Sequence, residues 1–211
     1  GKAGTGKTRL AAAWAQRARL RGERVLLTCF NDPLAAEITR RVGTFDNLMI
    51  GPFLRMALAL EGIPELGGDE DDPDFWNFDV PNHLHEHWPH VRRRFDTIVV
   101  DEAQDFSPAW LELLDALLDP DGPRRVLMVA DTSQELYPRG FVVPGTDEGW
   151  VRCELVYNCR NSVQIASLIR QRFDGASSPI GGPEAVGIQW LEASDVETLV
   201  DVAMAEYDRV V

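Results

Sequence analysis

The first eight residues of the chain, Gly1 to Thr8, carry the residue types that bind phosphate. Their sequence, GKAGTGKT, fits the pattern G-x-x-x-x-G-K-[ST] at every fixed position. Glycines let successive backbone N–H groups turn toward phosphate oxygens, and the helix that follows points its positive end at the same anion. Lys7 would reach the β- and γ-phosphates, and the Thr8 hydroxyl would hold Mg²⁺. The alternative is a glycine-rich turn that only precedes an alanine-rich helix.

An acidic turn has the chemistry for the second half of such a site. The apolar segment 98–100 ends in Asp101-Glu102-Ala103-Gln104-Asp105. A carboxylate at the tip of a strand beside a phosphate loop can hold Mg²⁺, which makes Asp101 the candidate ligand. The adjacent Glu102 can position or deprotonate a water for attack on the γ-phosphate. An acidic turn with no catalytic role is the alternative.

The elements that must position these residues alternate between helices and strands. Apolar runs predict strands over 24–29, 47–50, 95–100, 125–130, 153–156 and 188–191. Helical patterns and caps predict helices from the phosphate loop to Gly22, over 32–42 with Asp32 as its cap, and over 52–60, 107–118 and 162–173, with a last helix after Ser194. The segment 62–79 is predicted to be a solvated loop. This alternation predicts an α/β fold with a mostly parallel sheet covered on both faces.

The phosphate loop also predicts what lies upstream of it. Such a loop hangs from the end of a buried parallel strand, and no residue precedes Gly1 in this sequence. We therefore expect the chain to be a fragment that lacks the first, central strand of its sheet.

Length and composition bound the remaining possibilities. A chain of 211 residues suits one α/β domain plus part of a second. No run of about 18 apolar residues is present, and no signal peptide is visible. The three cysteines lie far apart, which indicates reduced thiols and a cytoplasmic location. The net charge of −13 argues against broad electrostatic adhesion to nucleic acid, although arginines cluster at 17–24 and 92–94.

All four histidines fall within one short stretch, at positions 83, 85, 87 and 90. On a helix, His83 and His87 would share a face and could bind a metal ion. No cysteine lies nearby and Pro89 interrupts the run. The preferred interpretation is therefore four ordinary surface histidines, with a metal site as the alternative.

The order of the motifs adds a resemblance. Asp-Glu-Ala-Gln-Asp at 101–105 resembles the second motif of superfamily 1 DNA helicases of the UvrD/Rep/PcrA type. The segments 29–31 with 35–37, 43–45, 130–137 and 155–162 resemble, in the same order, motifs Ia, Ib, III and IV of that family. The segment from Cys29 to Leu34 and the short stretch between motifs Ib and II are most similar to helicases fused to NERD-type nuclease domains. The resemblance covers about residues 1 to 170.

The resemblance implies a fold and a set of partners. Residues 1–150 would form a RecA-like P-loop ATPase domain, and residues 151–211 would open a second RecA-like domain that is cut short. ATP and Mg²⁺ would be the cofactors, and single-stranded or partly duplex DNA would be the partner. ATP would close the cleft between the two domains, and hydrolysis would reopen it, so that the motor steps along the strand.

The resemblance also implies a role for individual residues. Nucleotide would be bound by Gly4, Thr5, Gly6, Lys7, Thr8 and Arg9, and Mg²⁺ by Thr8 and Asp101. Catalysis would use Glu102 as the base, Gln134 as the γ-phosphate sensor and Arg160 as an arginine finger. The DNA path would include Phe30, Asn31, Thr44, Phe45 and Tyr137. From the residues alone, Phe30 and Phe45 could equally be core aromatics, because stacking platforms and core rings look alike in sequence.

The chain departs from the family pattern at several positions. Cys159 stands where an adenine-stacking tyrosine is usual, Asp46 where a histidine usually follows motif Ib, and Ala130 where motif III usually begins with glycine. The upstream glutamine motif and motifs V and VI are absent from these 211 residues. Two alternatives therefore stay open: a P-loop ATPase that acts as a switch in DNA repair or defence without unwinding, and a degenerate helicase module that binds DNA without turnover.

Overall fold

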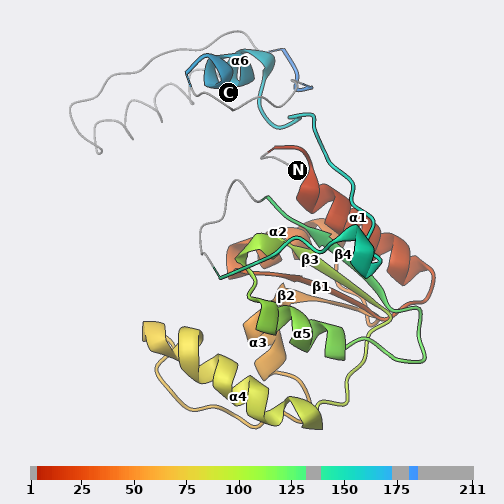
Figure 1. The fold of residues 1–211 in the computed structure, drawn as a ribbon, viewed down its shortest axis with the longest axis vertical. Helices are drawn as coiled ribbons and strands as arrows, with labels where there is room; N and C mark the ends of the chain where they lie inside the picture. Colours follow the sequence, from red (N-terminus) through yellow and green to blue (C-terminus); the bar gives the residue numbers. More distant parts are fainter. Residues whose placement is uncertain (1–3, 132–138, 173–180, 185–211) are drawn as a thin grey trace. The chain divides into compact units, whose positions relative to one another are not determined.

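Four parallel strands carry the candidate site at their carboxyl ends. In the computed structural model, which describes residues 4–131, 139–172 and 181–184, these strands are β1 (Val25–Cys29), β2 (Leu48–Pro52), β3 (Thr97–Asp101) and β4 (Arg125–Val129). They lie in the order β2-β1-β3-β4, and every pairing is parallel (Figure 1). This confirms the α/β prediction, and the arrangement is that of a RecA-like P-loop domain.

Helices cover both faces of this sheet. On one face, α1 (Lys7–Leu20) and α2 (Asp32–Val42) pack small and branched side chains against alternate strand residues such as Val25, Leu27 and Val99. On the other face, α3 (Phe53–Leu58), α4 (Val80–His87) and α5 (Pro108–Ala116) form an aromatic-rich core with Leu26, Ile98 and Val100. The alternation of side chains along β1 and β3 therefore explains why both strands are buried throughout.

Helix α1 fits the sheet closely because its inner face consists of small residues. Ala11, Ala15 and Ala18 are fully buried at a spacing of three or four residues. The helix contacts β1, β3 and β4. Helix α1 therefore packs closely against three of the four strands.

Three local features differ from the expectations above. The side chain of Asn31, not Asp32, caps α2 by accepting a hydrogen bond from the Leu34 amide at 2.9 Å. Residues 75–79 form a π-helical turn that runs directly into α4, so the end of the predicted loop is helical. The segment 153–156 is not a strand, and 188–191 lies outside the described residues.

The chain divides into two compact units, Gly1–Tyr157 and Asn158–Val211. The second contains α6 (Val163–Arg172), close to the helix predicted over 162–173. Within this unit the Asn158 and Pro183 carbonyls accept the Gly181 and Val163 amides. Over the described part of the chain, no helix is long and apolar enough to cross a membrane.

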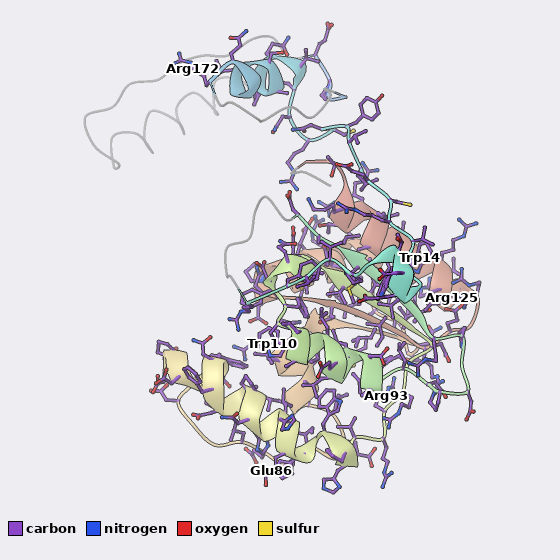
Figure 2. All side chains as sticks on the ribbon, viewed as in Figure 1. Trp14, Glu86, Arg93, Trp110, Arg125 and Arg172 are labelled. Carbon is purple, nitrogen blue, oxygen red and sulfur yellow. The ribbon has the colours of Figure 1, made fainter. Side chains whose placement is uncertain are left out.

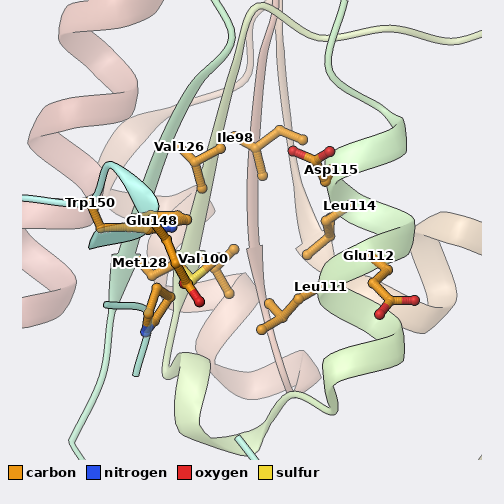
Figure 3. A pocket seen from close by; sticks show the side chains of 11 residues that line it. Ile98, Val100, Leu111, Glu112, Leu114, Asp115, Val126, Met128, Glu148 and Trp150 are labelled. Carbon is orange, nitrogen blue, oxygen red and sulfur yellow. The ribbon is translucent and has the colours of Figure 1, made fainter. Parts of the chain in front are cut away.

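An apolar cavity of about 400 Å³ lies between β4, α5 and the segment 144–150 (Figure 3). Figure 3 shows Val126 and Met128 of β4 on one side of it and Leu111 and Leu114 of α5 on the other. Residues of β4 are accordingly less buried than those of β1 and β3. No residue of the phosphate loop or of the acidic turn lines this cavity, so we do not assign it to the nucleotide.

Candidate active site

The phosphate loop has the backbone conformation that its glycines allow. Gly4 and Gly6 have φ angles of 75° and 91°, in the region that favours glycine, and α1 begins immediately after Gly6. A side chain at Gly6 would meet no atom within 4 Å, so the backbone angle, not a lack of space, requires glycine there. The loop therefore presents the amino end of α1, which favours an anion, beside Lys7.

Lys7 forms a buried ion pair with Asp131. Its Nζ lies 3.1 Å from Asp131 Oδ2, and the two side chains are 8% and 2% exposed. Asp131 lies two residues beyond the end of β4, the strand beside β3. The pair therefore joins the phosphate loop to the carboxyl end of the sheet.

Asp101, the last residue of β3, is fully buried behind this loop. Its Oδ1 accepts the Glu102 amide at 3.1 Å, whereas its buried Oδ2 has no hydrogen-bond partner among the described residues. Burial raises the pKa of Asp101 to about 6, although the neighbouring Thr8 hydroxyl opposes this shift. A buried carboxylate oxygen without a donor, close to a hydroxyl, matches the oxygen ligands that Mg²⁺ prefers. Asp101 and Thr8 thus fit the predicted metal site.

Glu102 has an unusual backbone. Its φ and ψ are 53° and 49°, a left-handed conformation that is uncommon outside glycine and costs about 1–3 kcal/mol. Its side chain accepts a hydrogen bond from Gln104 Nε2 at 2.9 Å. The strained turn and this hydrogen bond together fix the direction of the candidate base.

Gln104 links the two halves of the site. Besides donating to Glu102, its buried side chain accepts the Asp131 amide through Oε1, also at 2.9 Å. A continuous chain of contacts therefore runs from Lys7 through Asp131 and Gln104 to Glu102. Neither Gln104 nor Asp131 was expected to have a role in the site. Each residue follows the end of a predicted strand, and this position is the signal that could have found it. Only the pairing of β3 with β4 shows that the two residues meet.

Cys29 lies at the end of β1, beside this acidic turn. Burial raises the pKa of its thiol to about 12, with the Asp101 carboxylate adding to the shift. The thiol is therefore protonated and inert at neutral pH.

An aromatic groove opens beside the nucleotide site. Phe30 follows β1, the strand that pairs with β3, and its ring lies 6.3 Å from that of Trp110 with an interplanar angle of 16°. The Arg139 guanidinium lies 5.3 Å from the centre of the Phe30 ring and 4.7 Å from the Trp110 ring. Asn31 lines the same groove, although its side chain also caps α2.

The structure does not bring Thr44 and Phe45 to this groove. Phe45 pairs with Leu48, the first residue of β2, and the Arg19 guanidinium near the end of α1 lies over its ring. Both contacts are at the amino ends of the strands, whereas Phe30 lies beyond a carboxyl end. At the carboxyl end of β2 the groove is lined by Phe53 and Arg55 instead, two residues that were not expected there.

The remaining predicted residues lie elsewhere. Arg9 is exposed on the first turn of α1. Gln134 and Tyr137 lie outside the described residues. Arg160 belongs to the second unit, where its amide donates to Asn158 Oδ1 at 3.1 Å, so its role as an arginine finger stays a prediction.

The histidines do not assemble a metal centre. The rings of His83 and His87 are 4.6 Å apart on α4, and His83 Nε2 lies 2.8 Å from the Pro64 carbonyl oxygen. Within the ranges that the structure describes, no group of three or more potential ligands could hold a metal ion.

Comparison with known families agrees with this geometry. Residues 1–139, more than half of the chain, match the family model described as an AAA domain. The chain belongs to this AAA domain family. The family is found in UvrD/Rep-like superfamily 1 helicases, and membership identifies the chain as a P-loop NTPase. No curated protein matches the chain at a significant level.

Proposed function

We propose that this chain is the ATP-binding and ATP-hydrolysing motor region of a UvrD-like DNA helicase or translocase. The observation that carries the proposal is the position of two sites on paired strands. Asp101 ends β3 in the nucleotide site, and Phe30 follows the neighbouring β1 in an aromatic groove. In parallel α/β sheets, ligands bind beyond the carboxyl ends of the strands, and aromatic grooves suit unpaired bases.

The residues of the nucleotide site have separate roles in phosphoryl transfer. Lys7 would neutralise charge on the β- and γ-phosphates, and Thr8 and Asp101 would hold Mg²⁺. The bound cation would supply further neutralisation of the developing charge. Glu102 accepts the proton of the attacking water, and the hydrogen bond from Gln104 keeps its carboxylate in place. In this proposal Gln134 and Arg160 complete the charge stabilisation, and an arginine finger contributes about 10³–10⁵ in rate in other phosphoryl-transfer systems.

The link from Gln104 to Asp131 supports coupling between ATP and DNA. Asp131 directly precedes the segment 132–138, which carries Gln134 and Tyr137 in the proposed motif III. A change at the Glu102 turn would therefore reach Asp131, the residue before that segment, through the Gln104 side chain.

Glu102→Gln tests the proposed chemistry. The amide cannot accept the proton of the water, so ATP binding should persist and turnover should fall at least a hundredfold. The measurement is steady-state phosphate release with and without oligothymidylate. Turnover that survives in Glu102→Gln would exclude this residue as the base.

A switch ATPase without unwinding activity is the second candidate. The net charge of −13 and the altered motifs favour it, because both weaken the case for extensive DNA contact. An assay of strand displacement on partly duplex DNA distinguishes the two candidates. A helicase separates the strands when ATP is supplied, whereas a switch ATPase does not separate them. A degenerate binding module is the less favoured alternative, because Lys7, Asp101 and Glu102 are present and assembled.

A further inference from the structure

The groove beside Phe30 is more elaborate than a single stacking ring. It encloses about 270 Å³, just below the roughly 300–1,000 Å³ of pockets for drug-sized ligands. Four aromatic residues line it: Phe30 after β1, Phe53 after β2, Trp110 of α5 (Figure 2) and Trp76 of the π-helical turn before α4. Phe53 and Trp110 are only 2% and 4% exposed, whereas Phe30 and Trp76 are partly exposed, so these last two supply the accessible aromatic surface of the groove.

Two arginines complete the groove, and each is held against an aromatic ring. The Arg55 guanidinium lies 4.6 Å from the centre of the Trp76 ring, and Arg139 lies over Phe30 and Trp110. Arginine at the edge of an aromatic pocket recognises a phosphate that is attached to a planar base. The occupant that fits both features is a nucleotide unit of a single strand.

One segment, residues 69–79, positions both arginines. Glu70 accepts from Arg55 Nη1 at 2.9 Å, and the Glu70 carbonyl accepts from Trp76 Nε1 at 3.0 Å. Asn77 Oδ1 accepts a weaker hydrogen bond from Arg139 Nη2 at 3.4 Å. This segment lies outside every helicase-like motif of the chain, so the resemblance implies no role for its residues.

We propose that Trp76 and Arg55 form the second wall of a pocket that holds one unpaired base of single-stranded DNA opposite Phe30, which Trp110 supports from the core, with Arg55 on the adjoining phosphate. The inference rests on the proposed function, because that function supplies the strand. It adds two specific residues from the segment between the motifs. These residues determine how firmly the strand is held beside the nucleotide site.

Electrostatics set a limit on this pocket. Asp32 and Glu70 both pair with Arg55, and a phosphate must replace at least one of these carboxylates. Both pairs are exposed, and exposed ion pairs are worth about 0–1 kcal/mol, so the replacement is inexpensive. Stacking therefore provides most of the affinity, and the dependence of binding on salt should be shallow.

Binding of fluorescein-labelled oligothymidylate to the 211-residue chain, followed by anisotropy, tests the proposal. Trp76→Leu removes the planar face but keeps an apolar side chain, and should weaken binding about 5- to 150-fold. Trp76→Phe keeps a ring and should retain most of the affinity. Phe78→Leu is the matched control, because Phe78 belongs to the same turn, is 61% exposed and does not line the groove.

A second variant tests the phosphate contact without altering the core. Arg55→Gln should reduce the slope of log affinity against log salt by about 0.7, the value for one phosphate on a single strand. This measurement remains valid even if Trp76→Leu does not fold. The melting temperature of each variant shows whether that variant is folded.

The outcomes separate the pocket from the function on which it rests. Equal losses in Trp76→Leu and Trp76→Phe, or an unchanged salt slope in Arg55→Gln, would overturn the second wall. If Phe30→Leu weakens binding while Trp76→Leu does not, the pocket is wrong and the DNA motor stands. If the parent chain binds no oligothymidylate with or without Mg-ATP, the proposed function itself fails.

Discussion

The ammonium of Lys7 lies 3.1 Å from the carboxylate of Asp131, although Lys7 is the residue expected to bind the nucleotide phosphates. Both side chains are almost completely buried, so the ion pair is poorly screened by water. A phosphate group that approaches Lys7 must compete with this carboxylate. Asp131 thus stabilises the nucleotide-free site and opposes the ligand at the same time.

Replacing Asp131 with asparagine should separate these two effects. Without the carboxylate, Lys7 loses a buried partner, and the unfolding free energy of the free protein should fall by about 3–5 kcal/mol. The same change removes the competitor, so Mg-ATP should bind more tightly and raise the melting temperature by more than it does in the parent. Calorimetric unfolding with and without Mg-ATP measures both quantities. Weaker nucleotide binding in Asp131→Asn would show that Asp131 belongs to the binding machinery.

Gln104 should act on turnover more than on nucleotide binding. Gln104→Leu removes the donor to Glu102 and the acceptor for the Asp131 amide, while leaving the phosphate loop unchanged. We expect kcat for ATP hydrolysis to fall about ten- to a hundredfold with a small change in KM. A fall in kcat that only follows the fall in Tm across temperatures would reduce Gln104 to a structural role.

The candidate nucleotide site has parts that the sequence alone indicates, because each part is local. A loop such as Gly4 to Thr8 and a turn such as Asp101-Glu102 each combine a strand or helix end with a short, recognisable run of residues. The contacts that join these parts were not predictable in the same way. Gln104 and Asp131 are 27 positions apart, and they meet only because β3 and β4 are paired.

The structure also differs from the predictions where the sequence allowed two local structures. Asn31 and Asp32 are both good caps, and only the backbone of Asn31, extended at φ −127° and ψ 157°, lets its side chain reach the Leu34 amide. The segment 62–79 looked like a loop because it is rich in Gly, Pro and acid. Its last five residues are helical because Phe75 and Val80 are buried in the core beside α3.

Asp96 provides a test of stability against pH. Its carboxylate accepts from the Arg24 guanidinium at 2.8 and 3.0 Å and from the Arg24 amide at 2.8 Å. The hydrogen bonds from Arg24 lower the pKa of Asp96 below its usual value. A lowered pKa means that the ionised form stabilises the fold above about pH 4, and that this contribution is lost as the pH falls through the folded pKa.

Asp96→Asn should therefore lower the unfolding free energy by about 1–2 kcal/mol at pH 7 and by less at pH 3, and the value is modest because Arg24 is partly exposed and the pair is screened. Urea unfolding at the two pH values measures this difference. Asp46→Asn is the control, because Asp46 is exposed and should change stability little at either pH. A penalty that is equal at pH 3 and pH 7 would mean that shape and the amide contact, not charge, explain the role of Asp96.

Phe30 and Phe45 should differ in their effect on DNA, although the resemblance placed both along the strand. Phe30 lies in the groove at the carboxyl ends of the strands, and Phe45 lies at the amino ends under Arg19. If the single strand follows the edge that holds the nucleotide, Phe30→Leu should weaken oligothymidylate binding by about 1–3 kcal/mol, the contribution of one stacked base. Phe45→Leu should leave binding unchanged and cost about 0.5–1 kcal/mol of stability through the lost contact with Arg19. Anisotropy and urea unfolding measure the two effects in the same samples. Equal losses of DNA binding would mean that the strand also passes the amino ends of the sheet, which would restore Thr44 and Phe45 to the DNA path.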